Sequence, residues 1–216
     1  MVTCHQKSVT LDLFTKGTSL SDLKIGIIVG STRPGRNGIQ VGQWVKDNAK
    51  AEGVEFELVD LHDYKLPMLE EPFPAGAGNY LGEAANAWAA KVAEFDGYIF
   101  VAAEYNHAVP AALKNALDYV NAEWNNKAAA IVSYGSMGGV RAGEHLRQIF
   151  GELQIADVRT HVMFSLFTDF TFGENGEATF TPADMKAGEL EGQITQLTAW
   201  ARALQPLRVE SEELVA

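Results

Sequence analysis

The chain has 216 residues, the size of a single domain, and its 47% hydrophobic composition is enough to build a large core. A formal net charge of −11 disfavours nucleic acid or an anionic membrane as partner, although it leaves room for a local basic pocket. Cys4 is the only cysteine, which excludes an intrachain disulfide, a CxxC pair and a cysteine zinc cluster. Because we find neither a secretory signal nor a membrane-length apolar stretch, we expect a cytoplasmic globular protein.

Short β-branched runs alternate with longer amphipathic segments along the chain. Five of the runs predict strands, at Lys24–Gly30, Val54–Asp60, Gly97–Ala102, Ala128–Tyr134 and Val158–Phe164. The first, third and fourth runs are almost continuously apolar, which is typical of parallel strands that helices cover on both faces.

Apolar residues recur at helical spacing between and after these strands. Steps of three and four residues predict helix over 81–95, over 109–120 and in the stretch that follows Pro182. The order βαβαβαβαβα predicts a parallel α/β sheet with right-handed crossovers. Five strands favour a flavodoxin-like three-layer sandwich, strand order 2-1-3-4-5, over the six-stranded dinucleotide-binding order.

One domain, residues 23–207, is expected to hold all of these elements. Residues 1–22 are predicted to form an N-terminal extension, and residues 208–216 an acidic, frayed tail. The dipeptide Asn175-Gly176 lies between two aromatic runs, so a small β-hairpin is expected over residues 170–180.

Ligands of open α/β sheets bind beyond the carboxyl ends of the strands, which directs attention to three loops. The first loop, Gly30–Gly38 (GSTRPGRNG), leads into a helix. Small residues let backbone amides approach a ligand there, and Arg33 and Arg36 favour a phosphate dianion. The alternative is a tight turn with two solvated arginines. The position after a buried strand favours phosphate, although neither GxxxxGK[ST] nor GxGxxG is present.

The second loop, Ala103–Pro110 (AEYNHAVP), follows the third predicted strand. Tyr105 and Asn106 offer a flat surface and an amide to a heteroaromatic ring. A polar loop that caps the next helix explains the same residues equally well. His107 and the other four histidines lack metal-ligand spacing, so no metal site is predicted.

The third loop, Ser133–Arg141 (SYGSMGGVR), carries three glycines and two serines before another predicted helix. Glycines allow the backbone to lie close to a ligand, and a glycine-permitted turn is again the simpler alternative. Three loops of this kind at one edge of one sheet are harder to explain separately than together.

Together these residues resemble the NADPH-dependent FMN reductase family, which includes bacterial and yeast quinone, azo and chromate reductases. The resemblance covers about residues 24–165. It depends on four features that occur in family order, namely the Gly-Ser-x-Arg start, the Glu-Tyr-Asn…Pro…Leu-Lys-Asn-Ala…Asp block, the Glu123-Trp124…Lys127 step and Ser133-Tyr134-Gly135…Gly138-Gly139. The second block is the most specific of the four.

The resemblance implies FMN as cofactor and NADPH or NADH as co-substrate. It implies that the FMN phosphate binds the first loop, that the isoalloxazine lies along the second, and that the third closes on the flavin. The implied cofactor-binding residues are Ser31, Arg33, Arg36, Asn37, Gly38, Ala103, Glu104, Tyr105, Asn106, Ser133, Tyr134, Gly135 and Ser136. Many family members have proline at the position of Ala103, and serine and asparagine at the positions of Arg36 and Gly38.

The function implied is ping-pong electron transfer from NAD(P)H to a small acceptor such as a quinone, an azo compound or a free flavin, without a catalytic side chain. The resemblance also implies a homodimer or homotetramer. The apolar loop Leu66–Pro74 is a candidate for that contact or for a lid, or it is an ordinary packed loop. Two other functions remain open, a nicotinamide-only dehydrogenase with Asp60 on the ribose, and a non-catalytic flavodoxin-like flavin-binding or electron-carrier module.

Overall fold

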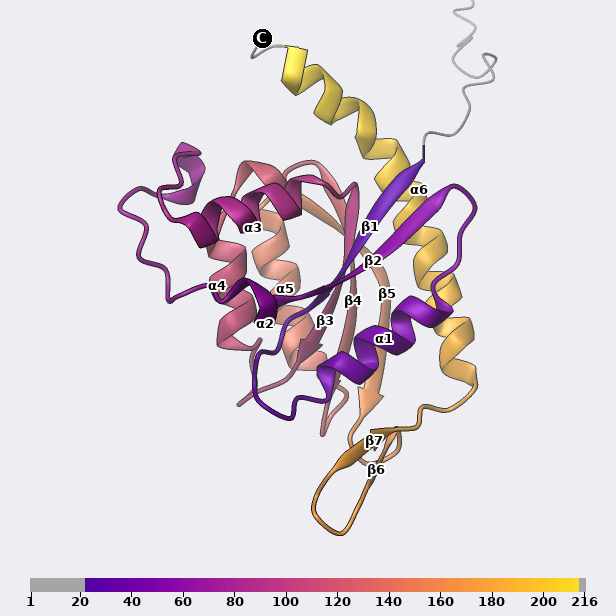
Figure 1. The fold of residues 1–216 in the computed structure, drawn as a ribbon. Helices are drawn as coiled ribbons and strands as arrows, with labels where there is room; N and C mark the ends of the chain where they lie inside the picture. Colours follow the sequence, from indigo (N-terminus) through magenta and orange to yellow (C-terminus); the bar gives the residue numbers. More distant parts are fainter. Residues whose placement is uncertain (1–21, 214–216) are drawn as a thin grey trace, which may run out of the picture.

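A parallel sheet of five strands forms the centre of the computed structural model, which describes residues 22–213 and no side chain beyond Arg208. The strands are β1 (Leu23–Val29), β2 (Val54–Asp60), β3 (Gly97–Ala103), β4 (Lys127–Gly135) and β5 (Ile155–Ser165). Their order is β2-β1-β3-β4-β5 (Figure 1), so the predicted flavodoxin-like fold is confirmed. The predicted extension over residues 1–22 lies outside the described residues except for Asp22.

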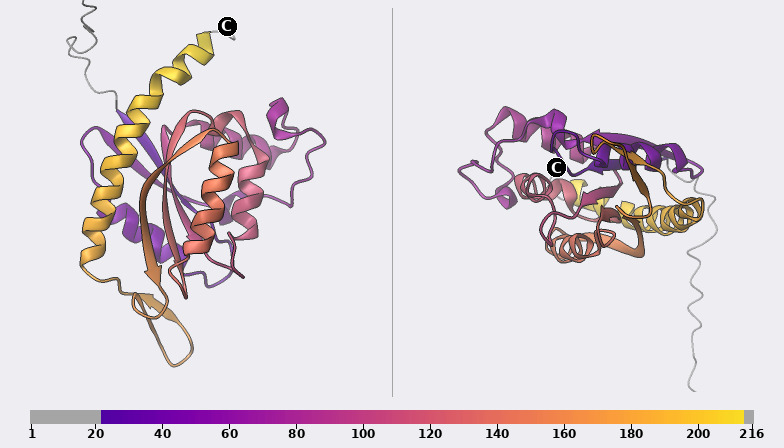
Figure 2. Two further views of the ribbon diagram at one scale, coloured as in Figure 1. Left: turned by 180° about the vertical axis from the view of Figure 1, so that it is seen from behind. Right: turned by 90° about the horizontal axis from the view of Figure 1, so that it is seen from below.

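Helices cover both faces of the sheet (Figure 2). On one face lie α1 (Gly38–Asn48) and the long α6 (Met185–Glu213), and on the other α3 (Glu83–Ala93), α4 (Ala111–Tyr119) and α5 (Val140–Glu152). Short elements complete the chain, namely α2 (Leu61–Tyr64), η1 (Ala75–Ala77) and η2 (Ala122–Trp124). No helix within residues 22–213 combines the length and the apolar content needed to cross a lipid bilayer.

Two hydrophobic cores form because successive strand side chains point to opposite faces. Ile27 faces the α1/α6 layer and Ile28 the α3/α4/α5 layer, and both are completely buried. The core under α3, α4 and α5 is aromatic, since the Phe100 ring lies 4.9 Å from the Phe150 ring and 5.9 Å from the Trp124 ring. Aromatic pairs of this kind each add about 0.5–1.5 kcal/mol beyond the area they bury. The sheet is therefore a stiff platform for the loops at its ends.

The predicted hairpin is present as β6 (Phe170–Phe172) and β7 (Ala178–Phe180). It attaches to α1 through Gln40, whose amide donates to the Ala178 carbonyl at 2.9 Å and accepts from the Phe180 amide at 2.9 Å. The Phe180 ring also packs 4.8 Å from that of Phe164 at the end of β5. The hairpin therefore extends the sheet layer beyond its carboxyl edge (Figure 1).

The last helix, α6, continues to Glu213, so the described part of the predicted tail has a helical backbone. Arg208 is joined to the body of the domain, where it donates to the Asn126 carbonyl at 3.1 Å and pairs with Asp96. These contacts join α6 to the body of the domain at Arg208.

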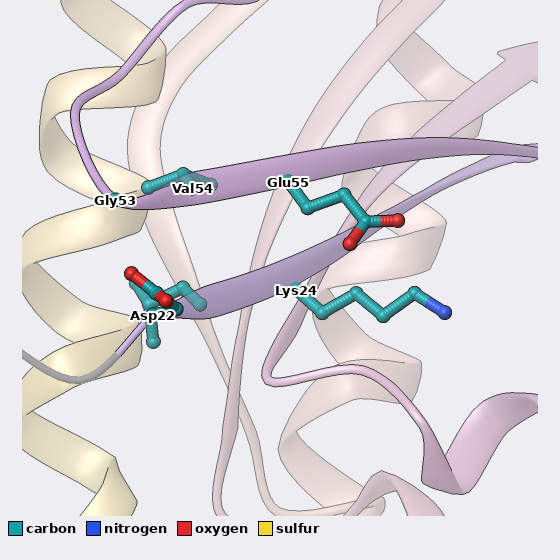
Figure 3. A pocket seen from close by; sticks show the side chains of 6 residues that line it. Asp22, Lys24, Gly53, Val54 and Glu55 are labelled. Atoms are coloured by element: carbon teal, nitrogen blue, oxygen red, sulfur yellow. The ribbon is translucent and has the colours of Figure 1, made fainter.

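A cavity of about 490 Å³ opens at the amino ends of β1 and β2 (Figure 3). Its charged lining residues include Lys24, which forms ion pairs with Glu57 at 2.8 Å and Glu94 at 2.6 Å. The Lys24 charge is therefore already paired within the protein, and the cavity lies at the edge opposite to the three loops singled out by the sequence.

Candidate functional site

The three loops meet because β1, β3 and β4 are neighbours in the sheet, with Val29 paired to Val101 and Ala103 to Tyr134. Backbone hydrogen bonds continue past the strands. The Gly30 amide donates to the Val101 carbonyl at 2.9 Å, and the Glu104 amide donates to the Tyr134 carbonyl at 3.0 Å. The predicted site therefore forms one surface at the carboxyl edge.

The first loop presents backbone amides and one exposed cation. No side chain caps the N-terminus of α1, where Asn37 is the N-cap, and its first turn holds no acidic residue. The first amides of a helix without such a cap favour an anion. Arg33 is exposed and its guanidinium carbon lies 5.9 Å from the Tyr105 ring centre. The buried Ser31 hydroxyl is hydrogen bonded to the Tyr105 hydroxyl at 2.7 Å.

Arg36 has a different partner from the one that the sequence implied. Its guanidinium forms an ion pair with Asp60 at the end of β2, and the two side chains are 15% and 13% exposed. Asp60 also accepts a hydrogen bond from the His62 amide at 3.1 Å. The ion pair joins the first loop to β2, and it occupies the carboxylate that a nicotinamide-only dehydrogenase would use on a ribose.

The second loop is a two-residue hairpin turn. Tyr105 and Ala108 exchange backbone hydrogen bonds of 3.1 Å, and Asn106 and His107 lie between them with φ of 48° and 75°. Two successive left-handed residues are the requirement of a type I′ turn, which asparagine tolerates better than histidine. Both side chains are exposed, so the turn presents the Asn106 amide at the edge of the site.

Glu104 is directed away from solvent and joins this loop to α5. Its side chain is 5% exposed, pairs with the Arg141 guanidinium, and accepts a hydrogen bond from the Arg141 amide at 3.0 Å. Arg141 also lies 3.1 Å from the His107 ring nitrogen Nδ1. Ala103 is fully buried in β3. Of these two predicted cofactor contacts, Glu104 has a protein partner in this structure, and Ala103 is part of the core.

Ser133 has a similar internal role in the third loop. Its completely buried hydroxyl donates to the Gly138 carbonyl at 2.6 Å and lies 2.7 Å from His161 Nε2. The single hydroxyl proton goes to Gly138, so His161 donates from Nε2 to the hydroxyl oxygen. Burial, together with the nearby Arg147 charge, lowers the pKa of His161 to about 4, so the ring is neutral at pH 7. The pair fixes the glycine loop to β5.

Tyr134 contributes a buried hydroxyl that lies between the first and third loops. It faces Ser31 and the Gly38 amide, yet it forms no hydrogen bond of normal geometry. A Cβ atom at position 38 would lie 2.7 Å from this hydroxyl oxygen, which explains the glycine there. Burial raises the pKa of Tyr134. A buried hydroxyl without a partner fits a hydrogen bond to a bound group.

The rest of the third loop is a turn, closed by a 3.1 Å hydrogen bond from the Gly138 amide to the Gly135 carbonyl. Gly138 and Gly139 have φ of 71° and 73°, the left-handed region that glycine adopts without strain. Ser136 is exposed at the corner of the turn. Together with Arg33, the free α1 amides and Tyr134, the loop offers hydrogen-bond donors and a positive charge that suit a phosphate group.

Residues 23–169 match the family model described as NADPH-dependent FMN reductase. The chain belongs to this family. Membership makes it an FMN-dependent enzyme that uses NAD(P)H, in agreement with the donor set at the carboxyl edge. Among the residues that the structure describes, no cluster of three or more His, Cys, Asp or Glu side chains could hold a metal ion.

Curated relatives and solved structures agree with this assignment. An NAD(P)H-dependent FMN reductase of Schizosaccharomyces pombe is 42% identical over 135 residues, which cover 61% of this chain and 68% of that protein. A 2-hydroxy-1,4-benzoquinone reductase of Burkholderia is 29% identical over 187 residues, covering 83% and 97%. The NAD(P)H:acceptor oxidoreductase FerB of Paracoccus denitrificans has the same fold, with a TM-score of 0.64 at 19% identity and coverage of 84% and 98%.

The apolar loop over residues 66–74 is fixed at one end and exposed at the other. Asn115 of α4 accepts from the Leu69 amide at 2.9 Å and donates to the Pro67 carbonyl at 2.6 Å. Met68, which lies between these two attached residues, is nevertheless 75% exposed, and Phe73 towards the other end of the loop is 47% exposed. The asparagine of the family block thus has a structural role, which its spacing alone did not indicate.

Proposed function

We propose that this protein is an NAD(P)H:quinone oxidoreductase that also reduces related small acceptors, azo compounds and free flavins among them, by a ping-pong mechanism. The observation that carries the proposal is the junction of the three loops, where the free amides of α1, exposed Arg33 and the unpartnered Tyr134 hydroxyl lie together. When bound there, FMN supplies the two-electron chemistry that links a hydride donor to the acceptor.

The side chains bind and orient, and none of them needs to react. Arg33 and the α1 amides would hold the phosphate, because a charge-assisted hydrogen bond to such a group is worth about 1.5–3 kcal/mol. Asn106 and the glycine loop would lie along the ring system. Glu104 and Ser133 support them, Glu104 through Arg141 and Ser133 through His161.

Steady-state kinetics test the proposal. NAD(P)H and a quinone should give parallel double-reciprocal lines, since both substrates would use one open face of the flavin in turn. Intersecting lines and a demonstrable ternary complex would contradict the shared face. A protein that binds FMN but oxidises NAD(P)H only at a negligible rate with a quinone present would instead be an electron carrier.

We also propose that the protein is a homodimer or homotetramer and that it is cytoplasmic. The exposed loop over residues 66–74 supports self-association, because Met68 and Phe73 leave apolar surface open. Sedimentation of the parent and of a Met68→Ser/Phe73→Ser variant tests the assembly, which should dissociate in the variant. Cell fractionation tests the location.

A further inference from the structure

A strongly exposed phenylalanine directly follows β5 at the carboxyl edge. Phe167 is 79% exposed, the highest value among the large hydrophobic residues of the described part of the chain. Leaving so much aromatic surface in water is unfavourable, because a fully buried phenylalanine stabilises a protein appreciably. A single exposed apolar side chain is common at protein surfaces, so the neighbours of Phe167 decide whether it marks a contact.

The turn that carries Phe167 is rigid, so its exposure is not the result of a loose loop. The Ser165 amide donates to the Asp169 carboxylate at 2.8 Å, and the Asp169 amide donates back to the Ser165 carbonyl at 2.9 Å. Thr168 Oγ1 donates to the same carboxylate at 3.0 Å, and Asp169 is only 4% exposed. These bonds hold the Phe167 backbone in place.

The same turn is hydrogen bonded to the glycine loop of the candidate site. The Leu166 amide donates to the Gly135 carbonyl at 3.0 Å, and the Ser165 hydroxyl donates to the Ser136 carbonyl at 3.4 Å. Met137, next along the glycine loop, is itself 69% exposed. Two exposed apolar side chains thus come from two segments that are bonded to each other, beside the loop expected to close on the flavin.

We propose that Met137 and Phe167 form an apolar wall that binds the planar ring of the electron acceptor and sets its specificity for apolar quinones. This inference depends on the proposed function and goes further, because it assigns two side chains to the acceptor. A flat, weakly polar ring matches an aromatic side chain and a polarisable thioether, both of which favour contact with π systems.

A second copy of the chain explains the exposure less well. The turn that carries Phe167 is hydrogen bonded to the glycine loop of the candidate site, whereas the loop over residues 66–74 is the surface already proposed for self-association. The chain after α2, which includes the loop over residues 66–74, runs on the side of α3 and α4, away from the β6/β7 hairpin (Figures 1 and 2). Phe167 and Met137 therefore form a separate, small patch suited to a small molecule.

The experiment compares Phe167→Ala and Met137→Ala with Phe172→Ala, a matched control on the hairpin whose side chain is 56% exposed. Calorimetry of each oxidised holoprotein gives the Kd of 2-methyl-1,4-naphthoquinone, and kinetics give its KM. Hexacyanoferrate(III), a hydrophilic acceptor, is the control substrate. FMN affinity and sedimentation are measured in parallel.

Phe167→Ala should raise both Kd and KM for the naphthoquinone about tenfold, which corresponds to about 1.4 kcal/mol. Met137→Ala should raise them about threefold, in keeping with the smaller worth of a thioether–aromatic contact. The KM for hexacyanoferrate(III) and the affinity for FMN should stay within about twofold of the parent, and Phe172→Ala should resemble the parent in every measurement.

Naphthoquinone constants at the parent level in Phe167→Ala would overturn the inference. A change in sedimentation with equal losses for both acceptors would also overturn it and would assign the patch to a second copy. A loss of FMN affinity would assign the wall to the cofactor instead. If the parent holoprotein binds naphthoquinone through Phe167 but does not reduce it with NAD(P)H, the proposed function is wrong and the assignment of Phe167 to quinone binding is kept. If the parent does not bind FMN, both fail.

Discussion

Replacing Arg36 by alanine separates two roles for the arginines of the first loop. In the sequence, both Arg33 and Arg36 are candidates for the FMN phosphate, although the resemblance favours Arg33 because many family members have serine at the position of Arg36. In the structure, Arg33 is exposed, whereas Arg36 is paired with Asp60. We therefore expect Arg36→Ala to affect mainly the stability of the apoprotein, and Arg33→Ala to affect mainly the binding of FMN.

The size of the stability loss in Arg36→Ala follows from the burial of the Arg36–Asp60 ion pair. Removing one partner of a buried pair costs about 3–5 kcal/mol, because the other charge stays buried and unpaired. The two side chains keep 15% and 13% exposure, and the Asp60 carboxylate retains the hydrogen bond from the His62 amide. Both facts reduce the cost, so the free energy of unfolding should fall by about 2–3 kcal/mol.

For the affinity for FMN, Arg33→Ala should have the larger effect and Arg36→Ala the smaller. Arg33→Ala removes a charge-assisted hydrogen bond worth about 1.5–3 kcal/mol and should weaken FMN by roughly ten- to a hundredfold. Riboflavin, which lacks the phosphate, should bind Arg33→Ala like the parent. Arg36→Ala should weaken both ligands by the same factor, less than about fivefold, through a looser loop.

Urea unfolding of each apoprotein and fluorescence titration with FMN and riboflavin provide the measurements. Asp60→Asn is the matched control, since it removes the same ion pair from the other side. The reasoning is refuted if Arg36→Ala unfolds at the parent urea concentration and selectively loses FMN, because Arg36 would then be a phosphate ligand.

Three further results are expected from other buried polar groups. Tyr134→Phe should leave the apoprotein at least as stable as the parent, because the lost hydroxyl has no partner. It should weaken the binding of FMN by about 1 kcal/mol. An FMN affinity equal to that of the parent would show that this hydroxyl is not part of the site. The pKa of His161 is about 4 in the folded protein and 6.5 ordinarily, so the free energy of unfolding should fall by up to about 3 kcal/mol as the pH drops from 6.5 towards 4. Urea unfolding of His161→Gln over the same pH range should not show this loss. Burial lowers the pKa of Lys127 to about 7, so the parent should gain stability as pH rises from 7 to 10, whereas thermal unfolding of Lys127→Met should show a flatter profile.

Regular spacing and composition made the strands predictable. Predicted strands Lys24–Gly30 and Val54–Asp60 differ from β1 and β2 by at most one residue, because continuous or alternating apolar runs report burial directly. The boundaries of Val158–Phe164 were less accurate, since β5 starts at Ile155 and its first residues are mostly half-buried. The hairpin was also foreseen from its asparagine-glycine turn signal.

The hydrogen-bond and ion-pair partners of the site's side chains could not be predicted from the sequence. Ser133 and His161 are 28 residues apart, Glu104 and Arg141 are 37 apart, and only the folded sheet brings them together. A local pattern shows that a serine or a glutamate follows a strand, but not whether it faces a ligand or a neighbouring loop. The first loop illustrates the same limit, because its two arginines are alike in sequence and different in burial.

The arrangement of the chain ends has a practical consequence. β1 starts at the amino edge of the sheet, and α6 begins beside the hairpin and runs back to that same edge (Figure 1). The described chain therefore enters and leaves on the side opposite to the site. A sensor surface or a fluorescent protein coupled directly at either end of the described chain should leave the carboxyl edge facing free solution and open to coenzyme and acceptor.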